Sequence, residues 1–397
     1  MTWEKVRLGD VLKEAKSGFA CGSKEETGVA QIRMNNVTRD GNLVWNEVRR
    51  VPPPKNLDKL LLCPGDILFN STNSPNLVGK SAFFNGFHEP LTFSNHFLRL
   101  RPSAGILDGS FLARCLVNEF QHGTFEHLCK RWVNQAAVSK EDLFALEIPL
   151  PPLAEQKRLA AILDRADELR RARRKVLLVL DELAQSLFLE LFGDPATNPK
   201  GWDLVKFASV GNSRLGKMLD AKRQTGNHLR QYIRNANVQW HSFDLDSIFK
   251  MDFDEKDREV FRLEIGDLMI CEGGEPGRAA VWRGEITECY YQKALHRVRL
   301  HKDKANAEYM VHLLWFMSKR GLLSDNVTSA TIAYLTGEKL SRLKIPLPPL
   351  ALQQQFAAQI TQLETIKARA RASLAEMDAL FASLQSRAFS GELSDAA

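Results

Sequence analysis

Ile148-Pro149-Leu150-Pro151-Pro152-Leu153-Ala154 occurs a second time in the chain as Ile345-Pro346-Leu347-Pro348-Pro349-Leu350-Ala351. The offset is 345 − 148 = 197 residues, close to half of the 397-residue chain. Seven identical residues in a row indicate an internal duplication. Proline is tolerated in the first turn of a helix and blocks helix upstream of it, so each cassette predicts the end of a globular domain and the start of a helix.

A sustained apolar period follows each cassette for about 40 residues without proline. Apolar positions recur at alternating spacings of four and three from Leu159 to Leu191, and at the same offset from Phe356 to Ala388. This pattern is typical of two helices packed along a common seam. Arg170 and Lys367 each place a basic side chain in the middle of one of these two apolar stripes. There the basic side chain either sets the register of the helices or contacts another chain. Two amphipathic helices packed on separate cores are the alternative, but the matched length and phase favour a pair.

The regions before the cassettes also repeat. Three anchors return in the second half. They are Trp3-Glu4-Lys5-Val6 with Trp202-Asp203-Leu204-Val205, Ile32-Arg33-Met34-Asn35-Asn36-Val37 with Ile233-Arg234-Asn235-Ala236-Asn237-Val238, and Pro64-Gly65-Asp66-Ile67-Leu68 with Ile265-Gly266-Asp267-Leu268-Met269. Between the anchors the copies diverge, most clearly at 70–80 and 271–278. Unlike loops on a common frame suit a protein that presents two different surfaces.

Short apolar runs bounded by Gly, Pro and Asn predict strands and turns, and Phe111–Phe120 predicts a helix. We therefore expect an α+β fold, with two mixed α/β domains joined by a long antiparallel two-helix coiled coil in a pseudo-two-fold internal duplication. The expected segments are residues 1–150, 151–195, 196–347 and 348–397. Helices of about 38 residues would span about 57 Å and hold the domains at opposite ends of a rod.

Bulk composition indicates a globular chain, with 44% apolar and 26% charged residues. A net charge of +6 permits a polyanionic partner without requiring one. The six cysteines are scattered without a CxxC pair, which favours reduced thiols over a disulfide framework or a zinc site. No apolar leader follows Met1 and no run approaches membrane-spanning length, so we expect a cytoplasmic protein without a membrane partner.

No catalytic, cofactor or metal site can be recognised in the sequence. Gly79-Lys80-Ser81 resembles the end of a phosphate-binding loop, but Ser74 replaces the required glycine. Gly273–Gly277 is more typical of a turn than of a dinucleotide site. Asp252 and Asp254 could belong to a nuclease carboxylate cluster, although a solvated acidic loop is the favoured interpretation. The histidines form no close metal pair, and neither Asn-Pro-Pro-Tyr nor Asp-Pro-Pro-Tyr occurs.

The polar residues at and between the repeated anchors suggest DNA binding instead. Arginine and asparagine match the hydrogen-bonding edges of guanine and adenine in the major groove. Each residue alone is more often an ordinary surface residue, and their recurrence at duplicated positions is the evidence. The candidate DNA-binding residues are Arg33, Asn35, Asn36, Asn70, Asn73, Lys80, Asn95, His96, Arg99, Lys130, Arg131, Asn134, Arg234, Asn235, Asn237, Arg278, Gln292, Lys293, His296 and Arg297.

Over essentially its whole length the chain resembles the specificity (S) subunit of type I restriction–modification systems. The resemblance rests on the twin cassettes with Glu155-Gln156 and Gln353-Gln354, the paired helices, the Gly-Asp-Ile/Leu elements and the closing Phe389-Ser390-Gly391-Glu392-Leu393. Leu352 stands where the first cassette has Glu155, so the two junctions differ.

This resemblance implies a non-catalytic subunit with two target-recognition domains, each reading one half of a bipartite double-stranded DNA sequence. The helices would act as a ruler and bind two methyltransferase (M) subunits, and restriction/translocase (R) subunits would complete the complex. S-adenosylmethionine, ATP and magnesium would belong to these partners, with no cofactor in this chain. Two alternatives stay open: the specificity component of a related methylation or defence system without a nuclease, and a coiled-coil adaptor that does not bind DNA.

Overall fold

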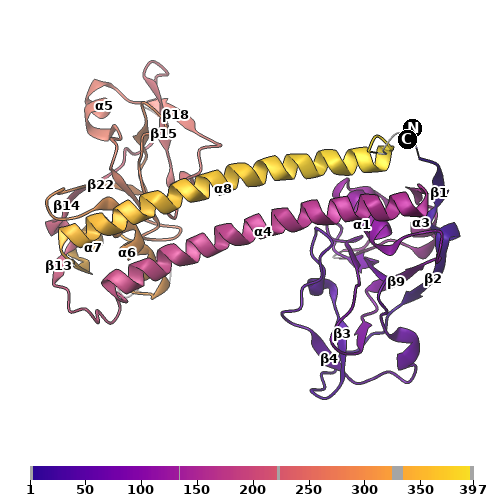
Figure 1. Cartoon of the computed structure of the whole chain (residues 1–397). Coiled ribbons are helices and arrows are strands. Elements are labelled where there is room, and N and C mark those ends of the chain that lie inside the picture. The colour runs from indigo at the N-terminus through magenta and orange to yellow at the C-terminus, as the bar shows by residue number, and fades with distance from the viewer. Residues whose placement is uncertain (1–2, 134, 221–223, 324–333, 394–397) are drawn as a thin grey trace. The chain divides into compact units, whose positions relative to one another are not determined.

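A computed structural model describes residues 3–133, 135–220, 224–323 and 334–393 (Figure 1). The chain divides into two compact units. Unit 1 comprises residues 1–174 and 372–397, and unit 2 comprises residues 175–371. Two long helices, α4 (Leu153–Phe192) and α8 (Leu350–Ser390), each contribute one part to each unit. The division into four segments and the separation of the domains along a rod stay predictions.

Unit 1 is built from small sheets and three short helices. A four-stranded antiparallel sheet has the order β2-β9-β5-β7, and a three-stranded sheet has the order β4-β3-β8 with β3 and β8 parallel. The strands and helices are β1 (Lys5–Arg7), β2 (Leu12–Ser17), β3 (Val29–Ile32), β4 (Arg49–Val51), β5 (Ile67–Asn70), β6 (Thr72–Asn73), β7 (Ser81–Phe83), β8 (Leu91–Phe93), β9 (Phe97–Pro102), β10 (Lys130–Arg131), β11 (Ala136–Ala137), β12 (Glu147–Pro149), α1 (Gly109–Gln121), α2 (Thr124–Leu128) and α3 (Lys140–Phe144).

Unit 2 repeats this topology. Its four-stranded sheet has the order β14-β22-β19-β20, and its three-stranded sheet has the order β18-β15-β21 with β15 and β21 parallel. The elements are β13 (Leu204–Lys206), β14 (Gly211–Leu215), β15 (Leu229–Ile233), β16 (Val238–Gln239), β17 (Ser242–Phe243), β18 (Phe249–Asp252), β19 (Leu268–Cys271), β20 (Ala279–Val281), β21 (Tyr290–Tyr291), β22 (Leu295–Leu300), β23 (Lys344–Pro346), α5 (Glu255–Phe261), α6 (Ala307–Lys319) and α7 (Gly337–Arg342). The predicted α+β duplication is confirmed.

The helix predicted at Phe111–Phe120 is α1. The Asp108 side chain accepts a hydrogen bond from the Phe111 amide at 3.0 Å and caps the helix, which buries Phe111, Leu112 and Leu116 in the core of unit 1. Its counterpart α6 is capped by Asn306, whose Oδ1 accepts from the Glu308 amide at 2.9 Å. The helix termini are therefore stabilised in the same way in both units.

Each cassette closes its domain against the first strand of that domain. β12 pairs with β1, with Ile148 opposite Val6, and β23 pairs with β13, with Ile345 opposite Val205. Because the following prolines cannot donate to a ladder, the pairing ends there and the long helix begins. The strand that opens the domain and the strand that closes it are thus held side by side at the start of α4 or α8.

A buried glutamine locks each cassette to the core helix. Gln156 accepts a hydrogen bond from the Asp108 amide at 2.8 Å and donates to the carbonyls of Ile106 and Pro151 at 2.9 and 2.8 Å. Gln353 accepts from the Asn306 amide at 2.9 Å and donates to the Pro348 carbonyl at 2.8 Å. Both side chains are fully buried. The cassette glutamines therefore satisfy backbone groups that burial would otherwise leave unpaired.

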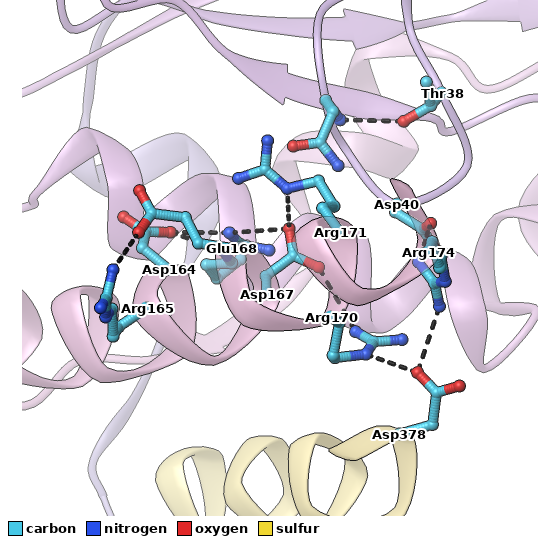
Figure 2. Close-up of polar contacts among 12 residues, drawn as sticks. Thr38, Asp40, Asp164, Arg165, Asp167, Glu168, Arg170, Arg171, Arg174 and Asp378 are labelled. Carbon is cyan, nitrogen blue, oxygen red and sulfur yellow. Dashed lines mark hydrogen bonds and ion pairs between the residues drawn. The ribbon is translucent and has the colours of Figure 1, made fainter. Parts of the chain in front are cut away.

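The two long helices run antiparallel within each unit. In unit 1, Arg170 of α4 donates to Asp378 of α8 at 2.6 Å, and its guanidinium lies 4.2 Å from the Phe381 ring centroid. Figure 2 shows Arg174 directed at the same carboxylate, at 3.1 Å. In unit 2, Lys367 of α8 pairs with Asp181 of α4 at 2.8 Å. The basic residues of both stripes thus pair across the seam, which agrees with a register-setting role.

The seam and the domain share one core in each unit. Leu159, Leu163 and Phe381 pack with the α1 residues of unit 1, and Phe188 and Phe356 pack with the α6 residues of unit 2. The interpretation of two helices on separate cores is therefore wrong. Among the described residues, no helix is both long and apolar enough to cross a membrane.

Unit 2 contains a buried histidine, His312, and a half-buried one, His241, that face each other beside a cavity of about 600 Å³. The His241 and His312 ring centroids lie 4.3 Å apart. His312 Nδ1 lies 2.9 Å from the Glu308 carbonyl, which favours the tautomer with the proton on Nδ1. Burial lowers the pKa of His312 to about 3 and that of His241 to about 4. Both rings are therefore neutral over the physiological range.

Replacing Gln156 with leucine should lower the free energy of unfolding of unit 1 by about 2–4 kcal/mol, because buried backbone groups lose their partners. Gln353→Leu should act in the same way on unit 2. Urea denaturation provides the measurement, and the exposed neighbour Lys157→Ala is the matched control. Equal unfolding midpoints for Gln156→Leu and Lys157→Ala would contradict the role assigned to this glutamine.

Acid should destabilise unit 2 through His312. Because its pKa is lower in the folded than in the unfolded chain, the neutral imidazole contributes stability above about pH 6.5, and that stability falls as the pH drops toward the folded pKa. At pH 5 the loss from His312 should be about 2 kcal/mol. Unfolding measured between pH 7.5 and 5 should show a smaller drop for His312→Phe than for the unaltered chain. A parallel drop in both would assign the acid sensitivity to other groups.

Candidate nucleic-acid interface

The repeated Arg-x-x-Asn segment supplies a backbone cap in both units. Asn36 Oδ1 accepts from the Arg33 amide at 2.9 Å, and Asn237 Oδ1 accepts from the Arg234 amide at 2.8 Å. Their side-chain amides donate to the carbonyls of Val44 and Asp244. Each asparagine is only 2% exposed. The prediction that Asn36 and Asn237 contact DNA is therefore wrong, because these side chains are used to shape the loop.

The repeated arginines on the central strands are also internal. Arg99 of β9 donates to the Leu61 carbonyl at 2.7 Å and lies 5.7 Å from the Phe93 ring centroid on β8, so it links the two sheets of unit 1. Arg297 of β22 donates to the Val260 carbonyl at 2.9 Å and lies over Tyr291. Both arginines are buried. They are frame residues, and the prediction of DNA contacts is wrong for them as well.

Three further candidates lie in the interior. Asn70 donates to the His96 carbonyl at 2.9 Å. Lys80 Nζ donates to the carbonyls of Met34, at 2.8 Å, and Val37, and burial, followed by the nearby Arg39 charge, lowers its pKa. His296 Nε2 lies 3.0 Å from the Leu335 carbonyl. Because all three side chains are buried among internal partners, the prediction that they contact DNA is wrong.

The other candidates are exposed or half-buried, except that Asn134 lies outside the described residues. In unit 1 they are Arg33, Asn35, Asn73, Asn95, His96, Lys130 and Arg131. In unit 2 they are Arg234, Asn235, Arg278, Gln292 and Lys293. Their binding to DNA stays a prediction, and the arrangement of these residues defines the candidate interface.

A groove in unit 1 brings three of them together. Arg33, Asn95 and His96 line a cavity of about 340 Å³ beside Cys21 and Gly22. Arg33 Nη2 donates to the Cys21 carbonyl at 2.8 Å, and burial together with the neighbouring Arg49 charge lowers the Arg33 pKa. Close positive charges that are not fully neutralised favour an anionic ligand. The groove therefore combines a cation with amide and imidazole groups suited to nucleic acid.

A backbone hydrogen bond connects the groove to a three-stranded sheet. The His96 carbonyl accepts from the Thr72 amide at 3.3 Å at the start of β6. β6 pairs with β11, with Asn73 opposite Ala136, and β11 pairs with β10, which carries Lys130 and Arg131. Residues far apart in the sequence thus form one connected series from the groove to the β10–β11 hairpin.

A second cavity of about 750 Å³ also borders Arg33. Arg49 and Arg50 line it together with Asn35, and three glutamates line it as well. Neither arginine is among the sequence-based candidates, although the Arg-Arg pair is visible in the sequence. The structure adds Arg49 to the candidate interface because it lines this cavity together with Arg33.

In unit 2 the candidates form two groups. Arg278 Nη2 donates to both the carbonyl and the side-chain oxygen of Asn235 at 3.1 Å, and Asn235 donates to the Gly273 carbonyl at 2.7 Å. Gln292 and Lys293 follow β21 in a separate turn, where Gly216 packs so closely that a Cβ would lie 2.2 Å from the Gln292 carbonyl oxygen. Arg234 stacks on Phe249 at 3.8 Å. The equivalent side chains thus have different surroundings in the two units.

The acidic residues near position 252 are structural. Asp252 is buried and accepts hydrogen bonds from the His228 and Gly226 amides at 2.8 and 2.7 Å. Burial alone would raise the Asp252 pKa, but these backbone donors lower it. Asp254 caps α5 by accepting from the Asp257 amide at 2.9 Å. The favoured interpretation of a solvated loop is wrong for Asp252. The described residues contain no group of three or more His, Cys, Asp or Glu side chains placed to hold a metal ion.

Comparisons with known proteins agree with the duplication. The model of the type I restriction modification DNA specificity domain matches residues 1–178 and again residues 199–376. The chain is 25% identical over 390 residues to a Methanocaldococcus jannaschii protein named as the MjaX type I restriction enzyme specificity subunit, covering 92% of this chain and 87% of that protein. It is 25% identical over 392 residues to the EcoKI specificity subunit of Escherichia coli, covering 91% and 82%.

A solved structure shares the fold. The S subunit of a type I restriction–modification system from M. genitalium superimposes with a TM-score of 0.62 at 14% identity, over 98% of this chain and 96% of that one. Since one family model accounts for most of the sequence in two successive matches, the chain belongs to the family of type I restriction–modification DNA specificity subunits.

Proposed function

We propose that this chain reads a bipartite sequence in double-stranded DNA, one half-site with each unit, as the non-catalytic specificity subunit of a type I restriction–modification complex. Family membership supports the role of the subunit. It also argues against a coiled-coil adaptor that does not bind DNA. Methylation of adenine in each half-site would be carried out by partner subunits, which would hold S-adenosylmethionine, ATP and magnesium.

The observation that carries the two-half-site proposal is the contrast between shared and unshared polar residues. Shared residues maintain the frame, as in the pairs of a half-buried arginine with a buried aspartate, Arg101–Asp66 and Arg299–Asp267, with shortest distances of 2.7 and 2.9 Å. Unshared residues shape the surfaces, such as Asn95 and His96 in the groove of unit 1 and the Arg278–Asn235 contact in unit 2. A common frame with unlike surfaces suits recognition of two unlike sequences.

The partner surface is proposed to lie on the long helices. Within unit 2, Val176, Val179 and Leu183 of α4 lie at helical spacings of three and four, and they are 42%, 50% and 48% exposed. In unit 1, Leu169 and Leu380 are 45% and 57% exposed. Apolar residues left in water on one helix face typically mark an interface. These two surfaces suit two M subunits, with R subunits completing the complex.

Deleting the gene should abolish one bipartite adenine-methylation motif from the host genome, and restoring it should bring back the same motif. Methylome sequencing with and without the gene is the measurement. The purified chain with S-adenosylmethionine should transfer no methyl group by itself. Exchange of residues 1–147 for those of another family member should change one half-site only. An unchanged methylome after deletion would contradict the proposed function.

Arg33→Ala should relax recognition in one half-site, and Arg234→Ala should do so in the other. A bidentate base contact contributes about 1–3 kcal/mol of discrimination, whereas a phosphate contact mainly changes affinity and its salt dependence. Competition binding with duplexes altered in one half-site at a time separates the two classes. Arg7→Ala is the control, because this exposed arginine of β1 lies outside the candidate interface and its removal changes the charge equally. Equal weakening on all duplexes would place the arginines among phosphate contacts.

A further inference from the structure

The tip of the β10–β11 hairpin in unit 1 exposes two large apolar side chains. Trp132 is 61% exposed and Val133 is 99% exposed. The Trp132 amide donates to the Gln135 carbonyl at 2.7 Å and closes the turn between the strands. No aromatic or cation–π contact of the Trp132 ring is found among the described residues. An indole held in water next to another apolar side chain favours an external partner.

The base of this hairpin is firmly anchored. Ala136 of β11 is fully buried and pairs with Asn73 of β6, and the Val138 amide donates to the Ser71 carbonyl at 3.0 Å. On the other strand, Arg131 Nη2 donates to the Glu126 carbonyl at 3.2 Å. The exposed tip is therefore carried on a short sheet with a fixed base. A side chain on such a support loses little conformational freedom when it binds.

Charge indicates which partner the tip meets. Lys130 and Arg131 are exposed and directly precede Trp132, and Arg131 also pairs with the Glu126 carboxylate at 3.3 Å. Through β6 and the His96 carbonyl, the hairpin is connected to the groove that contains Arg33, Asn95 and His96. A basic strand beside an apolar tip complements a polyanion with stacked bases. It fits nucleic acid better than the apolar surface of a protein.

We propose that Trp132, supported by Val133, is a stacking wedge that enters the base stack of the DNA bound by unit 1. Lys130 and Arg131 hold the phosphates on either side of the step that the wedge opens. This inference rests on the proposed DNA-binding function and adds deformation of the duplex to it. Aromatic side chains stack on any base, and inserted apolar side chains partly unstack a step and bend the helix. The wedge thus contributes affinity at a step that need not be read by hydrogen bonds.

The test uses the full chain assembled with its methyltransferase partner. The probes are duplexes that carry the motif found by methylome sequencing, with 2-aminopurine placed at successive steps of the half-site assigned to unit 1. Binding should raise the fluorescence at one step. Trp132→Ala should abolish that rise and weaken binding about 5- to 150-fold, the range expected for one stacked base. Trp132→Phe should keep most of the fluorescence rise and most of the affinity. Ile106→Ala, which removes an exposed apolar side chain elsewhere in unit 1, should leave both unchanged.

A second experiment separates the effect of Trp132 from that of the basic residues Lys130 and Arg131. Lys130→Ala with Arg131→Ala should weaken binding to all duplexes and reduce the salt dependence. Trp132→Ala should lose less affinity for a duplex with an abasic site at the step where the fluorescence rises, because this step is already open in such DNA. Specific binding with an unchanged fluorescence rise in Trp132→Ala would overturn the wedge alone, as would loss of assembly with the methyltransferase. Absence of specific binding by the unaltered complex would overturn the proposed function and the wedge together.

Discussion

The buried glutamine of each cassette is the contact on which the architecture of both units depends. The start of each long helix lies against the segment that caps a core helix. Gln156 and Gln353 join the two by pairing with buried backbone groups, the Asp108 or Asn306 amide at the cap and the Pro151 or Pro348 carbonyl in the cassette. The tryptophans that open the repeats add a second closure, because Trp3 donates to the Ala388 carbonyl at 2.8 Å and Trp202 donates to that of Phe192 at 2.9 Å. Each long helix is thereby part of its domain core.

The side chains between the two long helices are packed differently in the two units. In unit 1, the buried Asp167 faces Arg170 and Arg171 at 3.4 Å (Figure 2). The Arg170 guanidinium also covers the Phe381 ring. The equivalent side chains in unit 2 are Glu364, Lys367 and Ala184. Lysine and alanine fill less volume than arginine and phenylalanine, and the cavity of about 600 Å³ with the paired histidines lies there. The ion pairs are therefore retained while the packing around them differs.

Arginine and asparagine are ambiguous in a sequence because the same donors that match base edges also match main-chain carbonyls. At duplicated positions, burial of the side chain separates a role in the frame from a role in binding. Duplicated arginines that are buried serve the frame, as Arg99 and Arg297 do by joining sheets, whereas the duplicated Arg33 and Arg234 have unlike surroundings. Surface chemistry that differs between the halves has no reason to recur. Trp132 illustrates the second class, because the residue 197 positions later in the sequence is Ser329.

The sequence by itself determined the duplication, the α+β class, the start of both long helices and their pairing, because these depend on local proline chemistry and on apolar periodicity. Only the tertiary structure decided which polar residues reach solvent. Burial of Asn36, Asn70 and Lys80 depends on loops and strands that are distant in sequence and meet only in the folded unit. The same is true of the series from Arg33 through His96 to Lys130, which is assembled by strand pairing between β6 and β11. Periodicity records the face of a helix, but it carries no information about which strands pair across a sheet.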